Sequence, residues 1–210
     1  MTAAQPLASD VAFTPAVKAI QTRKGSRQAY AQVEENGGWR KQIDDRLAAF
    51  LAETNSFYLA TATADGQPYI QHRGGPKGFV KILDKNTLAF ADYSGNRQFL
   101  TQGNLSENSK AHIFIMDYSR RRRVKIWGEA RVVEGDVELT AKLMPHGYRA
   151  RPEHVILFTV SAWDANCPQH IPQRFEAADV AAALAERDNR IEALEAEVRR
   201  LRHCGGIALK

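Results

Sequence analysis

An alternating stretch in the middle of the chain constrains the fold more than any other feature. Between residues 124 and 132, small or apolar side chains alternate with longer polar or aromatic ones. The first set is Val124, Ile126, Gly128, Ala130 and Val132, and the second is Lys125, Trp127, Glu129 and Arg131. This period of two is typical of an antiparallel strand with one buried face.

Further strand-like runs surround this stretch, and short turn sequences separate them. Asp65-Gly66 and Asp84-Lys85-Asn86 are two such turns. The expected strands are Phe57–Thr63, Pro68–Ile70, Phe79–Leu83, Thr87–Ala91, Ala111–Tyr118, Val124–Val133 and His154–Trp163, with short helices at Arg97–Asn104 and Val137–Leu143. At least six strands with short turns predict a mainly β (α+β) domain, an antiparallel barrel or sandwich rather than a parallel α/β sheet.

The two ends of the chain have helical patterns. Residues 1–55 form a predicted helical lead-in, with helical spacing over Arg40–Glu53, and the strand domain spans 56–174. A long helix is expected over 175–204, followed by a tail at 205–210. Its apolar positions recur at alternating intervals of four and three, with one polar member: Val180, Leu184, Arg187, Ile191, Leu194, Val198 and Leu201. Such a heptad stripe fits either a partner helix or an amphipathic helix lying on its own barrel.

Composition excludes several classes of protein. No apolar run approaches the ~20 residues that span a bilayer, and two cysteines in 210 residues make no disulfide framework, so a cytoplasmic location is expected. The net charge of +5 suits an anionic ligand, nucleic acid or an acidic surface. The run Arg120–Arg123 lacks interleaved aromatic residues, so nucleic acid is not expected. No metal-ligand spacing is present, so no metal is expected.

Two polar clusters follow neighbouring strands and suggest one anionic cofactor between them. The first is Asp92, Asn96, Arg97 and Gln98, placed where a helix N-terminus would add free amide groups. The second is Gln71, His72, Arg73, Gly74, Gly75, Pro76 and Lys77. Arginine suits phosphate, and the glycines allow close approach of a flat ligand. A polar segment after the last strand, with Asn166, Cys167, Gln169 and Arg174, could form a rim.

From about Phe50 to Arg174 the chain resembles the pyridoxamine 5′-phosphate oxidase-like flavoproteins, which have the FMN-binding split-barrel fold. Four ordered segments carry the resemblance. They are Phe57–Pro68, Phe90–Arg97, Leu105–Asn108 and Arg123–Ala130, the last with its Gly-x-Ala.

The resemblance implies a homodimer with FMN at the interface. It places Arg97 and Gln98 where the family has an Arg-Lys pair on the phosphate, so Arg73 or Lys77 is expected to supply the missing charge. Arg123 falls where the oxidases use a glutamine near the flavin. Gly74, Gly75 and Pro76 are expected beside the ring.

The substrate is not indicated. The Arg-Leu-His motif with which the oxidases grip pyridoxamine phosphate is absent, so an uncharacterised branch is expected rather than the vitamin B6 oxidase itself. The interpretation is an FMN-dependent oxidoreductase with a small-molecule substrate and NADPH or NADH as a candidate electron donor. The alternative is a protein that binds a flavin, a deazaflavin, heme or another flat cofactor without turnover. No catalytic side chain is assigned.

Overall fold

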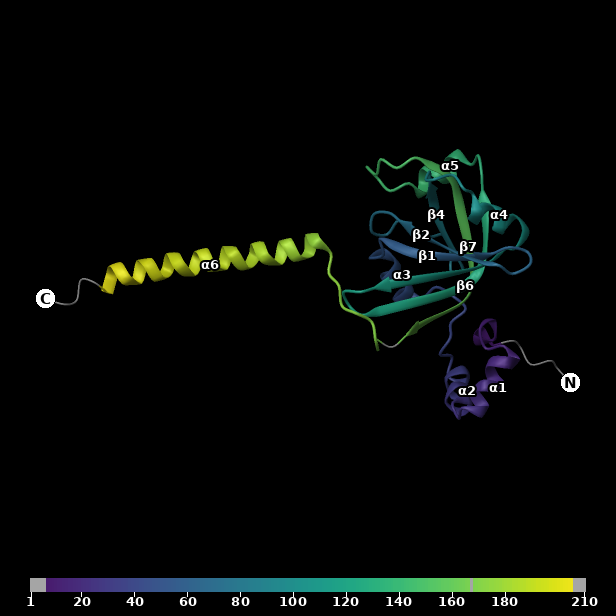
Figure 1. Cartoon of the computed structure of the whole chain (residues 1–210). Helices are drawn as coiled ribbons and strands as arrows, with labels where there is room; N and C mark the ends of the chain where they lie inside the picture. The colour runs from purple at the N-terminus through teal and green to yellow at the C-terminus, as the bar shows by residue number, and fades with distance from the viewer. Residues whose placement is uncertain (1–6, 167, 206–210) are drawn as a thin grey trace. The chain divides into compact units, whose positions relative to one another are not determined.

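The protein was examined as a computed structural model that describes residues 7–166 and 168–205 (Figure 1). The described residues fall into two compact units. The first comprises residues up to Asp117 together with Arg122–Gln169. The second comprises Tyr118–Arg121 and the residues from His170 onward.

The first unit is built on one seven-stranded sheet in the order β2-β1-β5-β6-β7-β4-β3. All its strand pairs are antiparallel, which confirms the predicted fold class. The strands are β1 (Ser56–Ala62), β2 (Pro68–Gly74), β3 (Lys81–Ile82), β4 (Thr87–Tyr93), β5 (Lys110–Asp117), β6 (Arg122–Val133) and β7 (Pro152–Asn166).

The alternating stretch forms β6, as predicted. Val124, Ile126 and Ala130 are at most 3% exposed. Next to Gly128 the register with β7 shifts by one residue, which is the mark of a β-bulge. A Cβ atom on Gly128 would overlap the backbone oxygen of Thr159 and lie 2.6 Å from Cε1 of Phe158. Only glycine fits where β7 crosses so closely.

Phenylalanine rings fill the core on the buried side of the sheet. Phe57 stacks on Phe79 at 5.6 Å and meets the edge of Phe90 at 5.0 Å. The strand predicted at Phe79–Leu83 is shorter than expected, because only Lys81–Ile82 pairs with β4. Phe79 and Val80 follow a turn at Gly78 and are buried in the core instead of extending the sheet.

The first unit also contains several helices, of which α3, α4 and α5 lie beside the sheet (Figure 1). They are η1 (Ala8–Val11), α1 (Pro15–Arg23), α2 (Arg27–Glu35), α3 (Asp45–Ala52), α4 (Leu100–Glu107) and α5 (Val137–Leu143). The helix predicted over Arg40–Glu53 begins only at Asp45, because the carboxylate of Asp44 caps it by accepting from the backbone N–H of Leu47 at 3.0 Å. The helix predicted at Val137–Leu143 is confirmed.

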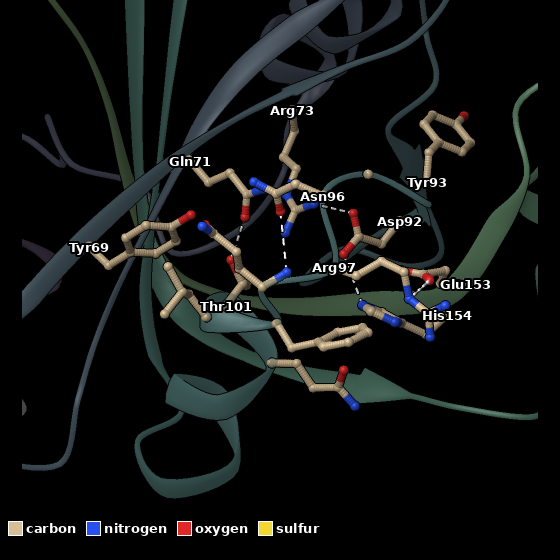
Figure 2. Close-up of a pocket in the computed structure, with 15 residues that line it drawn as sticks. Tyr69, Gln71, Arg73, Asp92, Tyr93, Asn96, Arg97, Thr101, Glu153 and His154 are labelled. Carbon is tan, nitrogen blue, oxygen red and sulfur yellow. Dashed lines mark hydrogen bonds and ion pairs between the residues drawn. The ribbon is translucent and has the colours of Figure 1, made fainter.

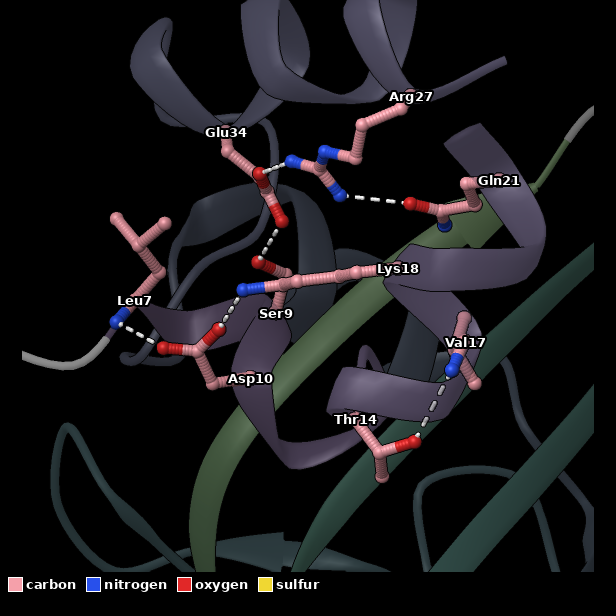
Figure 3. A network of polar contacts seen from close by, with 9 residues as sticks. All are labelled: Leu7, Ser9, Asp10, Thr14, Val17, Lys18, Gln21, Arg27 and Glu34. Carbon is pink, nitrogen blue, oxygen red and sulfur yellow. Dashed lines mark hydrogen bonds and ion pairs between the residues drawn. The ribbon is translucent and has the colours of Figure 1, made fainter. Parts of the chain in front are cut away.

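Polar contacts hold the N-terminal helices to one another (Figure 3). Glu34 of α2 accepts from the hydroxyl of Ser9 at 2.8 Å and pairs with Arg27. Arg27 also donates to Gln21 of α1 at 2.6 Å. Lys18 of α1 pairs with Asp10 of η1 at 2.6 Å. This network links three short helices in which no apolar side chain is fully buried.

Aromatic rings join this helical segment to the sheet. Trp39 lies between Phe13, at 5.2 Å, and Trp127 of β6, at 4.7 Å. Backbone hydrogen bonds between Arg40 and Trp163 of β7 fix the chain beside these rings. His112 of β5 meets the face of Trp127 at 4.8 Å. Burial, followed by the charge of Lys125, lowers the pKa of His112 from 6.5 to about 4.

The second unit contains the long helix α6 (Ala177–Gly205) and the turn Tyr118–Arg121. Gln173 donates to the backbone oxygen of Ser119 at 2.8 Å, and the guanidinium of Arg174 lies 4.8 Å from the ring centre of Tyr118. In the described part of the chain no helix is long and apolar enough to cross a membrane.

Candidate functional site

A small solvent-open hollow of about 50 Å³ lies where β2 and the C-terminal end of β4 meet the start of β7 and the N-terminus of α4. Figure 2 shows its side chains converging from these four elements. The hollow is lined by Tyr69, Gln71, Arg73, Asp92, Tyr93, Gly95, Asn96, Arg97, Gln98, Phe99, Leu100, Thr101, Gln102, Glu153 and His154.

A buried charged group forms the inner wall of the hollow. Asp92 of β4 pairs with Arg73 of β2, and its other oxygen lies 2.8 Å from Nε2 of His154 on β7. The three side chains are 9%, 11% and 6% exposed, respectively. A buried carboxylate is costly unless it has partners, and Asp92 has two. The Nε atom of Arg73 is buried and makes no hydrogen bond to the described residues. It is thus a buried donor without an acceptor among the described residues.

The outer wall is the loop between β4 and α4, whose backbone is strained. Arg97 and Phe99 have φ angles of 59° and 56°, in the left-handed region that non-glycine residues rarely adopt. Asn96 holds the loop by accepting from the backbone N–H of Gln98 at 3.2 Å. The side chain of Arg97 is 68% exposed, lies over the ring of Phe99 and reaches Glu153 only at 3.5 Å. Arg97 is thus a loosely held cation at the mouth of the hollow.

The N-terminus of α4 lines the hollow and has no side-chain cap. The helix predicted from Arg97 begins at Leu100, because the left-handed residues Arg97 and Phe99 interrupt helical geometry. Phe99 occupies the cap position and contributes no capping hydrogen bond. The first N–H groups of a helix have no acceptor within it, so they are free for an anion. Thr101 fixes this end by donating to Gln71 at 2.9 Å.

The charges of the lining side chains balance. Arg73 and Arg97 are each paired with a carboxylate, Asp92 and Glu153 respectively. An anion in the hollow would therefore meet the partial positive charge of the helix N-terminus rather than a net positive charge of side chains. Arg97 is the exposed arginine at this site.

The structure brings together six of the residues predicted from sequence: Gln71, Arg73, Asp92, Asn96, Arg97 and Gln98. The period of two in β2 explains which members of the second cluster join them. Gln71 and Arg73 line the hollow, whereas His72 points to the other face and meets Tyr58 edge-on at 5.7 Å.

The other predicted residues have different surroundings. Lys77 pairs with Glu53 at 3.3 Å, and a Cβ on Gly75 would lie 2.7 Å from the ring of Phe79, so packing explains that glycine. Gly74, Pro76, Arg123 and Gln169 do not line the hollow. Arg174 belongs to the second unit. Asn166 is described by its backbone alone, as the last residue of β7, and Cys167 lies outside the described residues.

Five polar residues of the hollow were not predicted: Tyr69, Thr101, Gln102, Glu153 and His154. Tyr69 could have been found, since it precedes Gln71 and Arg73 at the same spacing of two. His154 reaches Asp92 because β7 pairs with β4 in the register that places them opposite each other. No local pattern reveals that pairing. Tyr93 also lines the hollow, but its ring points away from the other labelled side chains (Figure 2).

The described residues include no group of three or more His, Cys, Asp or Glu side chains that could hold a metal ion. The polar groups of the hollow are amides, hydroxyls, arginines and paired carboxylates. These groups suit an organic anion such as a phosphate ester better than a bare cation.

The antiparallel sheet and its flanking helices define a class of protein, the small split-barrel domain. The family model for pyridoxamine 5′-phosphate oxidase matches residues 43–167. The chain belongs to this family, as the resemblance predicted. No curated protein matches it in a sequence comparison.

The solved structures that resemble this chain are distant in sequence. HupZ of Group A Streptococcus is 19% identical, with a TM-score of 0.49, over 63% of this chain and 100% of that one. An FMN-binding protein from Syntrophomonas wolfei is 11% identical, with a TM-score of 0.45, over 70% and 97%. HutZ, the heme storage protein from Vibrio cholerae, is 14% identical, with a TM-score of 0.39, over 57% and 89%.

Proposed function

We propose that the protein is an FMN-dependent oxidoreductase that acts on a small molecule, and that the hollow receives the phosphate of FMN. The observation that carries this proposal is the N-terminus of α4, which has no side-chain cap and lines the hollow in a member of the pyridoxamine 5′-phosphate oxidase family. The first N–H groups of this helix are donors without acceptors in the helix, and phosphate oxygens are acceptors for such groups.

The residues of the hollow have separate roles in this proposal. Asp92 pairs with both Arg73 and His154 and so fixes the inner wall of the hollow. Thr101 and Gln71 anchor the start of α4 to β2. Arg97 turns from Glu153 onto the phosphate, at small cost because an exposed pair 3.5 Å apart is weak.

Because two carboxylates line the hollow, one chain offers a dianionic phosphate no net positive charge. We therefore propose a homodimer in which a second copy completes the cofactor site. FMN, when bound, supplies the hydride and electron exchange, while the protein positions it and excludes water. NADPH or NADH is the proposed electron donor.

The first experiment identifies the ligand. The protein purified under native conditions is expected to show flavin absorption, and mass spectrometry of the released ligand is expected to find FMN. Bleaching by NADPH or NADH supports the reductase. Retained flavin that only dithionite reduces supports a binding protein without turnover. Release of heme or a deazaflavin, or of no ligand after reconstitution with FMN, contradicts the proposal.

The second experiment places the phosphate. The variant Arg97→Glu reverses an exposed charge and leaves the buried group intact, so FMN binding should weaken at least about tenfold in fluorescence titration. The matched control is Arg131→Glu, an exposed arginine of β6 that does not line the hollow. The double variant Arg73→Ala with Arg97→Ala should lose the flavin entirely. Full flavin occupancy in a folded double variant would show that the phosphate binds elsewhere.

A further inference from the structure

Helix α6 presents a narrow apolar stripe that the described chain leaves open. It runs for 29 residues, and every side chain described in it is exposed. The apolar members of the stripe are 43% to 57% exposed: Val180, Leu184, Ile191, Leu194, Val198 and Leu201. A solitary helix in water is only marginally stable, so a stripe of this kind needs a covering surface.

We propose that α6 pairs with α6 of a second copy of this chain as a parallel, in-register, two-stranded coiled coil. The spacing places Leu184, Ile191 and Val198 at the a positions of a heptad, and Val180, Arg187, Leu194 and Leu201 at the d positions. Ile or Val at a with Leu at d favours two parallel strands. The last two heptads follow this rule at every a and d position.

The flanking charges select a second copy as the occupant. In a parallel pair, each g residue faces the e residue of the following heptad on the other helix. Arg190 at g then faces Glu195 of the second copy, and Glu197 at g faces Arg202 of the second copy. Both pairs have opposite charges, and the symmetry of the dimer makes each of them twice. The helix is thus complementary to itself.

The polar member of the stripe also fits this arrangement. A residue at d packs beside the e residue of the partner helix, which places Arg187 next to Asp188 of the second copy. Within one helix these two side chains are only loosely paired, at 3.8 Å, and are more than 60% exposed. A single polar residue in a coiled-coil seam fixes register at a cost in stability.

Other coverings of the stripe fit less well. An antiparallel pair with Ile191 opposite Leu194 would bring Asp188 near Glu195 of the other helix, where the charges repel, and Arg190 near Glu197, where they attract. Its flanking charges therefore cancel, whereas both flanking pairs of the parallel dimer attract. An anionic membrane surface would require a basic polar face. The helix instead carries six acidic residues and five arginines. None of this depends on the proposed flavin.

Disulfide trapping in the full-length protein tests the pairing. In a background with Cys167→Ser and Cys204→Ser, the variant Leu194→Cys places a thiol in the seam. Equivalent d positions of a parallel pair lie within disulfide range. Mild oxidation should therefore convert most of the protein to a covalent dimer. The matched control is Ala196→Cys, at the outward f position two residues away, which should stay monomeric on a denaturing gel.

A charge exchange tests the register. Arg190→Glu, added to the Leu194→Cys variant, should reduce disulfide trapping, because two attractive pairs become repulsive. The protein concentration at which half of the chains are trapped should rise about tenfold. Adding Glu195→Arg should restore trapping. Glu195 also pairs with Arg199 of its own helix at 3.7 Å, so the variant with both charge changes is compared with each single charge change.

Four results would overturn the proposal. An absence of trapping in the Leu194→Cys variant would mean that α6 covers its stripe within its own chain. Mixed dimers of the Ile191→Cys and Leu194→Cys variants, without any dimer of Leu194→Cys alone, would mean an antiparallel pair. Equal trapping of the Leu194→Cys and Ala196→Cys variants, or no rescue by Glu195→Arg, would mean unspecific proximity.

Discussion

Asp92 shows how a residue that looks like part of a polar turn becomes the centre of a site. In sequence it follows an apolar strand and precedes Tyr-Ser-Gly. In the structure it is 7% exposed and joins Arg73 and His154, which are distant from it in sequence. The residue types of this site were predictable. The pairing of Arg73 with Asp92, which neutralises the charge of Arg73, was not predictable, because it depends on how β2, β4 and β7 lie next to one another.

Removing the charge of Asp92 should destabilise the fold. Asp92→Asn leaves the buried Arg73 without its carboxylate, and breaking a buried pair in this way costs about 3 kcal/mol of unfolding free energy. Urea unfolding followed by tryptophan fluorescence measures the loss. The control is Glu53→Gln, which breaks the exposed Lys77 pair and should cost less than about 0.5 kcal/mol. Equal losses would show that the Asp92 pair is not an energetic centre.

His112 should make the stability of the first unit depend on pH. Its pKa falls from 6.5 to about 4 on folding, so the folded state binds fewer protons than the unfolded state. The free energy of unfolding is therefore highest, with respect to this group, above pH 6.5, and it decreases as the pH falls from 6.5 toward 4. We expect a loss of about 2 kcal/mol, discounted from the full shift because the ring is partly exposed. His112→Phe should remove this part of the pH dependence, and an unchanged slope in the variant would contradict the assignment.

At the scale of the elements, strand periodicity was the most reliable guide. It predicted the buried face of β6, and applied to β2 it would have separated Gln71 and Arg73 from His72. The start of α4 could not be predicted, because two residues with ordinary helical propensity, Arg97 and Phe99, adopt left-handed backbone. The short β3 also escaped prediction, since the two residues before it, Phe79 and Val80, look like strand residues but fill the core.

Two glycines should respond in opposite ways to the same added methyl group. Gly128→Ala forces a Cβ into the backbone of β7, so it should destabilise the protein by several kcal/mol, on the order of 3. Gly103→Ala lies in α4, where a Cβ would meet nothing within 4 Å, and should stabilise by about 0.5–1 kcal/mol. Thermal unfolding of both variants checks the signs. A neutral Gly128→Ala would mean that β7 can move away from β6.

At the scale of the whole first unit, the N-terminal helices are held to the sheet by few groups. Trp39 and Trp127 form the main apolar contact, and the chain beside them pairs with Trp163. The sequence placed Trp39 only within a helical lead-in. Its contact with Trp127, about ninety positions away, leaves no local pattern in the sequence. The helical segment and the sheet should therefore unfold together while Trp39 is in place.

Trp39→Ala should allow the N-terminal helical segment to unfold separately from the sheet. Loss of a half-buried indole should cost about 2 kcal/mol and should expose the connection between α1 and α2 to trypsin at Arg23 and Lys24. Limited proteolysis with N-terminal sequencing measures the cleavage rate, with Trp39→Phe as the control that keeps an aromatic ring. Unchanged cleavage in Trp39→Ala would show that the polar network of Ser9, Arg27 and Glu34 is sufficient.

The left-handed backbone at Arg97 and Phe99 lowers the free energy of unfolding of the protein. Each of these residues carries about 1 kcal/mol of backbone strain. Typical domains are stable by only about 5–15 kcal/mol, so two strained residues take up a substantial part of that margin. Glycine would adopt the same backbone without the strain. Glycine at position 97 would relieve the strain but remove the exposed cation of the hollow, so Arg97→Gly should raise the stability of the protein while it weakens the binding of an anion.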